Sequence, residues 1–297
     1  MNYKLILQLH VHSNRSHDSS VSIEEYVKYL DENCFENELV VLAITDHNVV
    51  PLSTLASFKY STKNVIVVPG IEWNIHKTVK QTLRRFASRK ELITLGDQDD
   101  FSEFIRNKTR NTLTNDGEIS NKISDDDILK YIQSHKDLTI IIPHPSHLFL
   151  EYFGKKQIRE LYKTIIDNNP GHNFFVEEKT GSDPFPRIFY TFKGKYPILG
   201  SSDAHRIYGF FKTITLNSVV TSIQDYAGIT AQWRASFENQ DLALYKEVIN
   251  IIPTYLTDYN HKIVIEKQLN LSILSLFGGI PAFIQRRFTD FPKRLFH

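Results

Sequence analysis

Apolar runs that end in histidine, aspartate or glutamate recur along the first two thirds of this chain. The residues at or just after these ends are His10 with His12, His47, Glu72, His144, Glu177, and Asp203 with His205. Helical patterns separate several of the runs, which is typical of βαβ units and a mainly parallel sheet. Because the carboxyl ends of the strands share one face of a β/α barrel, we expect these residues to meet in one site.

The apolar runs give the predicted strands, and the intervening patterns give the predicted helices. Strands are expected at 3–11, 39–44, 65–68, 138–142, 174–176 and 196–199, with 213–216 as a candidate last strand. Helices are expected after Ser22, over 52–60 and around 155–167. Ser22 and Glu25 have the spacing of a capping box, in which each side chain accepts from the other's backbone N–H.

Two regions depart from this alternation. Residues 77–137 are polar and charged, with helix-like pieces near 98–107 and 124–134, and are interpreted as an insertion. The sequence after about residue 215 is expected to be mostly helical, over 219–232, 242–252 and 262–277. We therefore predict a barrel domain over 1–215 and a C-terminal helical extension over 216–297.

The candidate residues are suited to transition metals. His10 and His12 are two residues apart, so on a strand their imidazoles point to the same face. The full set has several imidazoles and at least three carboxylates. Cys34 is the only cysteine, which rules out a four-cysteine zinc site. Such a mixture suits Zn, Mn or Fe better than Ca or Mg, and its size indicates two or three divalent ions. Closely spaced divalent ions are the apparatus of phosphoester hydrolysis.

Five motifs, in this order, resemble those of the PHP (polymerase and histidinol phosphatase) family. They are His10-Val-His12 with Ser-Asn-Arg-Ser-His-Asp18-Ser, Ile-Thr-Asp46-His47-Asn, Pro-Gly-Ile-Glu72, Pro-His144-Pro, and Gly-Ser-Ser-Asp203-Ala-His205. They span residues 5–205. The resemblance implies an α/β fold with a distorted (β/α)7 barrel, which here would carry the C-terminal helical extension.

The resemblance also implies a ligand set for three metals. One metal would be held by His10, His12, Glu72 and Asp203, and a second by Asp18, His47 and His205. Glu72 would bridge to a third, which His144 also binds. A metal-bridging hydroxide would attack the phosphorus, with His10, His47, Asp203 and His205 as the catalytic group. The family usually adds a histidine a few residues after the glutamate, for which the nearest candidate is His76.

Other residues near these motifs are each compatible with two roles. His17 competes with Asp18 as a ligand, and His76 and His147 are as compatible with ordinary surface histidines. Asp46 and Glu177 are interpreted as carboxylates that orient a ligand or support the structure. Arg15 and Arg206 lie beside ligands and are candidates for binding a substrate phosphate, although solvated surface arginine is the more frequent fate.

Three basic clusters have the composition of a phosphate-backbone contact. They are Lys80/Arg84/Arg85/Arg89/Lys90, Arg106/Lys108/Arg110, and the tail with Arg286, Arg287, Lys293 and Arg294. The first follows Glu72 closely and would attract nucleic acid if it lines the catalytic face, whereas the alternative is a solvated helix surface. Aromatic residues of the tail could stack bases, or pack on the barrel or a partner subunit.

Overall charge and hydropathy exclude some other classes. The formal net charge of +1 gives no global electrostatic case for nucleic acid or membrane binding. The apolar runs are far shorter than a membrane span, and the start of the chain lacks the pattern of a signal peptide. A cytoplasmic location is therefore expected.

The sequence predicts a metal-dependent phosphoesterase, with three alternatives for its role. The first is hydrolysis at a nucleotide or a nucleic-acid end, as a nuclease or phosphatase. The second is a small-molecule phosphatase of the histidinol-phosphatase type. The third is a metal-binding accessory subunit without turnover, docking on a protein partner or on itself through residues 219–297.

Overall fold

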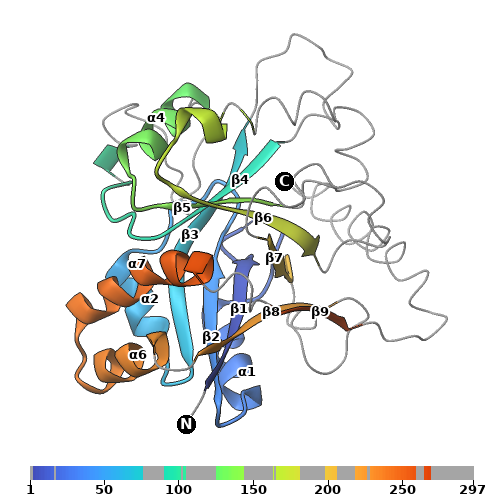
Figure 1. The fold of residues 1–297 in the computed structure, drawn as a ribbon, viewed down its shortest axis with the longest axis vertical. Coiled ribbons are helices and arrows are strands. Elements are labelled where there is room, and N and C mark those ends of the chain that lie inside the picture. Colours follow the sequence, from blue (N-terminus) through green and yellow to red (C-terminus); the bar gives the residue numbers. More distant parts are fainter. Residues whose placement is uncertain are drawn as a thin grey trace, which may run out of the picture.

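A curled nine-stranded sheet forms the centre of the protein (Figure 1). The computed structural model describes residues 3–16, 18–75, 90–101, 103–104, 125–143, 163, 165–180, 198–205, 218–225, 228–258 and 264–268. The strand order is β7-β6-β5-β4-β3-β2-β1-β8-β9. The strands are β1 (Tyr3–Val11), β2 (Glu38–Ile44), β3 (Val65–Ile75), β4 (Lys90–Leu95), β5 (Thr139–Ile142), β6 (Asn173–Thr180), β7 (Ile198–Ser201), β8 (Ser218–Asp225) and β9 (Val264–Gln268).

Strand directions fall into two parallel sets with antiparallel additions. Strands β1, β2 and β3 run parallel to one another, as do β5, β6 and β7. Strand β4 is antiparallel to both neighbours, and β8 and β9 extend the β1 edge in antiparallel fashion. The sheet curls until Val11 forms an isolated parallel bridge with Ala204, which follows β7. The predicted α/β class and barrel-like curl are confirmed.

One apolar cluster fills the interior of the curl. It contains at least one buried side chain from every strand from β1 to β8, among them Leu7, Val41, Ile66, Ile93, Ile141, Phe175, Leu199 and Ile223. Helices α6 (Ile229–Glu238) and α7 (Leu242–Asp258) pack Trp233, Tyr245 and Ile249 against the same cluster. Each fully buried side chain of this size contributes about 1.5–3 kcal/mol. Helices α6 and α7 therefore contribute to the same core as the strands.

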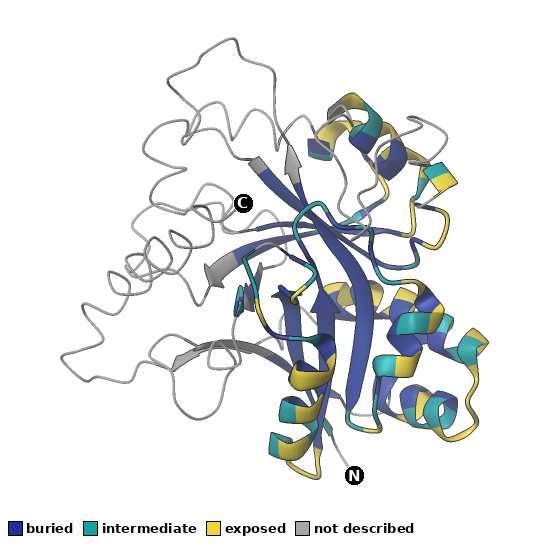
Figure 2. Cartoon of the chain, turned by 180° about the vertical axis from the view of Figure 1, so that it is seen from behind, coloured by how far each residue is buried: buried dark blue, intermediate teal, exposed yellow. Residues whose placement is uncertain are grey.

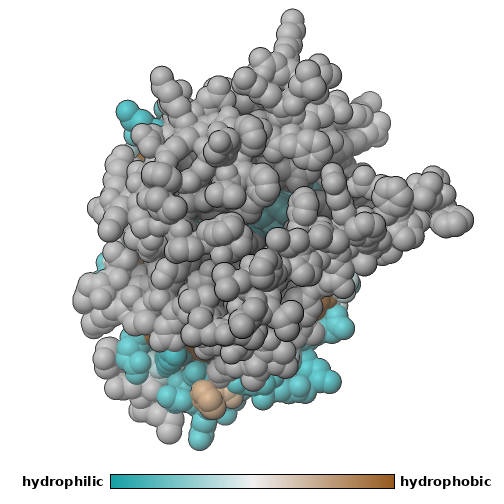
Figure 3. Space-filling view, turned by 90° about the vertical axis from the view of Figure 1, so that its right-hand side faces the viewer, coloured by the Kyte–Doolittle hydropathy of each residue, from teal (hydrophilic) through white to brown (hydrophobic). Residues whose placement is uncertain are grey.

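Further helices cover the other face of the strands. Helix α1 (Ile23–Asn33) buries Tyr26 and Leu30 over β1 and β2, and the predicted capping box between Ser22 and Glu25 is present. Helix α4 (Asp125–Ser134) packs over β3 and β5, whereas α2 (Thr54–Tyr60) packs Phe58 against Trp233 and Tyr245 of the interior cluster. Figure 2 shows the buried strands between these partly exposed helices. On the side drawn in Figure 3, the described surface is mainly hydrophilic.

A bulge in β1 decides which way the first two histidines face. Gln8 pairs with Leu42, but Val11 pairs with Ile44, so β1 has one more residue than β2 between these pairs. Without the extra residue, His10 would share the α1 face with Ile6 and Gln8. With it, His10 and His12 both turn toward the interior of the curl, where they contact carboxylates from β3 and β6.

Two of the predicted C-terminal helices are wrong in part. Strand β8 occupies residues 218–225, where the predicted helix 219–232 began, and helix α6 starts only at Ile229. Strand β9 lies within the predicted helix 262–277. Both segments contain β-branched residues. Strand β8 pairs with the open edge of β1 and β9 pairs with β8, and this pairing outweighs their local helical pattern. The predicted helix 242–252 is confirmed and continues through Pro253 to Asp258.

Strand β4 was not predicted, because it lies in the charged region interpreted as an insertion, whereas the helix expected near 124–134 is confirmed as α4. Several predictions lie outside the described residues. They concern His17, His76, His144, His147, Arg206, the side chains of the basic clusters and strand 213–216. The domain division at 215 stays a prediction. Among the described residues, no helix is long and apolar enough to cross a membrane.

Candidate metal centre

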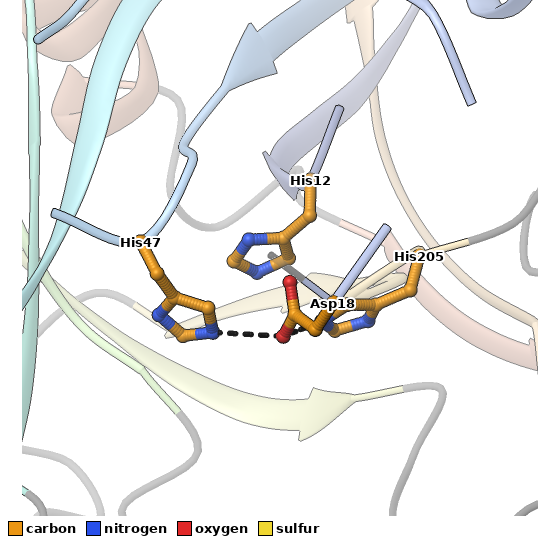
Figure 4. Close-up of side chains that lie close together, drawn as sticks. All are labelled: His12, Asp18, His47 and His205. Carbon is orange, nitrogen blue, oxygen red and sulfur yellow. Dashed lines mark hydrogen bonds and ion pairs between the residues drawn. The ribbon is translucent and has the colours of Figure 1, made fainter. Parts of the chain in front are cut away.

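Seven of the predicted ligands lie together at one edge of the curled sheet. They are His10, His12, Asp18, His47, Glu72, Asp203 and His205. We call His10, His12 and Glu72 the inner group, because each is fully buried. We call Asp18, His47, Asp203 and His205 the rim group, because their side chains keep between 11% and 22% of their exposure. Figure 4 shows His12 beside three residues of the rim group.

The inner group directs its ligand atoms at a common point. His10 Nε2 lies 3.0 Å from Glu72 Oε2 and 3.0 Å from His12 Nε2. His12 Nε2 lies 3.1 Å from the same Glu72 oxygen. Asp203 Oδ1 reaches in from the rim group, 3.5 Å from both Nε2 atoms. These four residues are the set that the sequence resemblance implied for one metal.

The rim group is centred on Asp18. Its Oδ2 lies 2.9 Å from His205 Nε2 and 3.3 Å from His47 Nε2 (Figure 4). The ring of His12 stacks on the rings of both histidines, with centroids 4.4 Å from His47 and 4.3 Å from His205. The ligand atoms of His12, Asp18, His47 and His205 all lie within 4.8 Å of one another. This geometry suits a second metal between the three imidazoles and the carboxylate.

Hydrogen bonds fix the orientation of two histidines. His10 Nδ1 lies 3.0 Å from Glu177 Oε1 and 3.2 Å from Oε2, and this carboxylate accepts a hydrogen bond from Nδ1–H. Glu177 is buried, so the contact persists and leaves His10 Nε2 aimed at the centre. In the same way His205 Nδ1 donates to the backbone oxygen of Asp203, at 2.9 Å, and leaves its Nε2 facing Asp18. Glu177 therefore orients a candidate ligand, which is one of the roles predicted for it.

Loop geometry supports the same arrangement. Asp46 accepts from Ser13 N at 2.6 Å and from Ser13 Oγ at 2.7 Å, so it holds the loop that follows β1. Asp203 adopts a φ of 48°, in the left-handed region that most residues avoid. This turn lets Asp203 and His205, two residues apart, both enter the centre. Such backbone strain is typical of functional sites.

The carboxylates and imidazoles of the cluster shift one another's pKa. Burial raises the pKa of Glu72, but His10 and His47 outweigh it and hold this pKa well below its usual range. Burial lowers the pKa of His10, but Glu72, Glu177 and Asp203 outweigh it and raise this pKa well above normal. The pKa of Asp18 is likewise lowered, because hydrogen bonds from His205 and His47 outweigh its burial. The carboxylates of Glu72 and Asp18 therefore stay ionised, and a divalent ion that binds His10 would compete with its proton.

Sequence reasoning missed Glu91, which lies near the start of β4 and is 8% exposed. Its carboxylate, Glu72 and His47 form a third group whose ligand atoms lie within 4.8 Å of one another. The sequence-based prediction looked for metal ligands only at the carboxyl ends of parallel strands. Because β4 is antiparallel to β3, it brings its amino end to that edge instead. The available signal was the alternation of Glu91, Ile93 and Leu95, of which the last two face the interior.

The structure gives Arg15 a contact with the protein itself. Its guanidinium donates to the backbone oxygen of Val50 at 2.5 Å. Burial lowers the pKa of Arg15, and the nearby Asp46 opposes this shift. A role of Arg15 in binding substrate stays a prediction, as does that of Arg206.

Comparison with known sequences gives the family. The sequence profile of the PHP domain matches residues 8–181, which is more than half of the chain. The chain belongs to the PHP domain family. As a PHP protein it is a metal-dependent hydrolase that acts on ester bonds, and the clustered histidines and carboxylates are suited to divalent metals. No curated protein matches the sequence.

Several solved structures are similar to this PHP chain. An amidohydrolase from Chromobacterium violaceum, with bound sulfate and no metal, is 15% identical, with a TM-score of 0.36 over 59% of this chain and 77% of that one. A candidate metal-dependent phosphoesterase from Bifidobacterium adolescentis is 10% identical, with a TM-score of 0.40 over 67% and 87%. PsfC from Pseudomonas syringae is 10% identical, with a TM-score of 0.39 over 80% and 98%.

Proposed function

We propose that this PHP protein hydrolyses phosphate esters at a nucleotide or nucleic-acid end, with two or three ions of Zn, Mn or Fe. The observation that carries the proposal is the sharing of residues among the three ligand groups. Glu72 belongs to two of these groups, one with His10 and His12 and one with His47 and Glu91, and the third group joins His12 to Asp18, His47 and His205. A carboxylate that binds two ions through its two oxygens would hold those ions close together. Closely spaced divalent ions activate water and stabilise both the attacking and leaving oxygens of a phosphoryl group.

The inner group and the rim group have different roles in this proposal. The inner group and Glu177 form the buried floor of the site, which keeps bulk water away from His10 Nε2 and holds that nitrogen in a fixed orientation. The rim group is the accessible side, so substrate enters past Asp18, His47, Asp203 and His205. Because these side chains are only 11–22% exposed, we expect a terminal phosphate to reach them more easily than an internal phosphodiester. We assign the catalytic contacts to His10, His47, Asp203 and His205.

Two substrate classes are compatible with a terminal phosphate. The basic residues that follow Glu72 in the sequence, among them Arg84, Arg85 and Arg89, favour a nucleotide or nucleic-acid end. The low exposure of the rim group favours a small phosphomonoester such as histidinol phosphate. We rank the nucleotide or nucleic-acid end first, because a small substrate gives the basic cluster no role.

The test is phosphate release in the presence of Mn²⁺, compared for a 5′-phosphorylated oligonucleotide, a mononucleotide and histidinol phosphate. Wild type, His10→Ala and Asp203→Ala are assayed beside His135→Ala, a control histidine paired with Asp100 outside the centre. We expect release from the oligonucleotide or mononucleotide that needs His10 and Asp203 but not His135. Turnover of histidinol phosphate alone would select the small-molecule alternative. Full activity of both alanine variants would contradict the assigned site.

A further inference from the structure

We infer that Tyr26 and Ser19 are positioning residues, whose hydroxyls fix the backbone turn that presents two metal ligands to the centre. The two ligands are Asp203 and His205, with Ala204 between them. This role rests on the proposed function, in which both residues bind metal. Tyr26 lies on helix α1 and outside all five sequence motifs, and it acts through the backbone of the turn.

The backbone conformation of this turn needs support from its neighbours. Asp203 has a φ of 48°, which lies in the left-handed region that residues with a side chain rarely adopt. Such a conformation persists only where the surrounding structure fixes it. His205 is two residues further on, so the directions of both ligand side chains depend on the backbone of Ala204.

The first two backbone oxygens of the turn accept three hydrogen bonds. His205 Nδ1 donates to the backbone oxygen of Asp203 at 2.9 Å. The backbone oxygen of Ala204 accepts from the backbone N–H of His12 at 2.9 Å and from the hydroxyl of Tyr26 at 3.3 Å. The first of these bonds is internal to the turn, and the second comes from the residue after β1. Tyr26 therefore adds the contact from helix α1.

Tyr26 and Ser19 hold successive backbone oxygens of the turn. The side chain of Tyr26 is fully buried in the cluster that also contains Val11 and Ala204, so its hydroxyl has little freedom to move. Ser19 Oγ donates to the backbone oxygen of His205 at 3.1 Å. With these bonds, every backbone oxygen from residue 203 to residue 205 accepts a hydrogen bond.

Preorganisation of the turn would make these two residues matter for metal binding. Without the bond from Tyr26, the metal-free turn can adopt other conformations, and a metal ion that binds must order it again. The free energy of this ordering weakens the binding. The backbone oxygen of Ala204 keeps its bond from His12, so the loss is that of one neutral hydrogen bond, which corresponds to about a fivefold change in affinity. This change is modest beside the loss expected when a ligand itself is removed.

The experiment compares Tyr26→Phe with Tyr245→Phe as a matched control. Tyr245 on α7 is also fully buried, and its hydroxyl also donates to a backbone oxygen, that of Val67. Zn²⁺ affinity is measured in the full chain by competition with a chromophoric chelator. We expect both variants to lower the melting temperature of the metal-free protein. Only Tyr26→Phe should bind Zn²⁺ about fivefold more weakly and show a smaller rise in melting temperature when Zn²⁺ is added.

Two variants of Ser19 keep the inference open to failure if Tyr26→Phe does not fold. Ser19→Ala removes the bond to the backbone oxygen of His205 and should weaken Zn²⁺ binding to a similar extent. Ser19→Thr keeps a hydroxyl and should bind Zn²⁺ like wild type. Wild-type affinity in Tyr26→Phe would overturn the inference, as would an equal loss in Tyr245→Phe or equal weakening in the two Ser19 variants.

Phosphate release by wild type is measured in parallel, because it separates this inference from the proposed function. Weaker Zn²⁺ binding in Tyr26→Phe, without phosphate release by wild type, would refute the proposed function alone. Phosphate release by wild type, with unchanged Zn²⁺ binding in Tyr26→Phe and Ser19→Ala, would overturn this inference alone.

Discussion

The inner group and the rim group use the same residue types in different structural settings. His10 lies on β1 and Glu72 lies on β3, and each strand is hydrogen-bonded to its neighbours in the sheet. The buried carboxylate of Glu177 fixes the ring of His10. Asp18, His47 and His205 lie in loops, and their side chains reach solvent. Strand positions are held by the ladder and the core, whereas loop positions depend on a few local hydrogen bonds. We therefore expect the inner group to set metal affinity and the rim group to adjust to substrate.

The largest expected effect comes from removing an inner ligand. His10→Ala should lower phosphate release by about 10³-fold or more, since divalent ions supply several kcal/mol of transition-state stabilisation. Metal content by elemental analysis should fall in parallel, while circular dichroism shows a folded protein. His47→Ala, in the rim group, should retain more metal. Equal metal loss in the two variants would break the distinction between the groups.

The next largest effect is expected on metal affinity when the pH is changed. Neighbouring carboxylates raise the pKa of His10 and His12, so both imidazoles must release protons before they bind metal. Metal affinity should rise with pH by about tenfold per unit for each proton displaced, below the folded pKa. Calorimetric titrations at several pH values, in buffers of different ionisation enthalpy, count the released protons. A flat profile across the neutral range would show that these imidazoles are already neutral.

The same groups give the metal-free protein the opposite trend. The raised pKa of His10 stabilises the fold fully below the unfolded value of about 6.5, and this contribution is lost as the pH rises through the folded pKa. The lowered pKa of Glu72 and Asp18 stabilises the fold above about pH 4, and this contribution is lost on further acidification. The melting temperature of the metal-free protein should therefore fall from weakly acidic to alkaline pH, and bound Zn²⁺ should reduce that fall.

The metal ligands that lie at the ends of parallel strands could be predicted from the sequence. His10, His12 and Glu72 could be predicted because side chains alternate along a strand and parallel strands end at a common edge. The bulge in β1 has no local signal, although it turns both histidines inward. Glu91 was missed because its position depends on the direction of β4, which only the pairing with β3 and β5 determines. Strand β8 was predicted as part of a helix because its pairing partner, the edge of β1, is more than 200 residues away in sequence, and β9 in turn pairs with β8.

Removing the charge that orients His10 should have an intermediate effect. Glu177→Gln keeps the size of the side chain but weakens the hydrogen bond to His10 Nδ1. Carboxylates in this role typically contribute about 10–100-fold to metal affinity or activity. We expect a loss near the lower end for Glu177→Gln and a larger one for Glu177→Ala, in both metal affinity and turnover. A loss of thermal stability with unchanged metal affinity would assign Glu177 to the core alone.

The smallest effect is expected at the equivalent support in the rim group. Ser16 Oγ donates to Asp18 Oδ1 at 2.7 Å and accepts from the backbone N–H of His47 at 3.4 Å. Ser16→Ala removes both bonds, but Asp18 is partly exposed and keeps its contacts with His47 and His205, so we expect only a several-fold loss of turnover. Because the rim group faces the substrate, the loss should appear mainly in KM, with metal content unchanged. A loss of metal as large as that of Glu177→Gln would mean that the loop ligands are as rigidly held as the strand ligands.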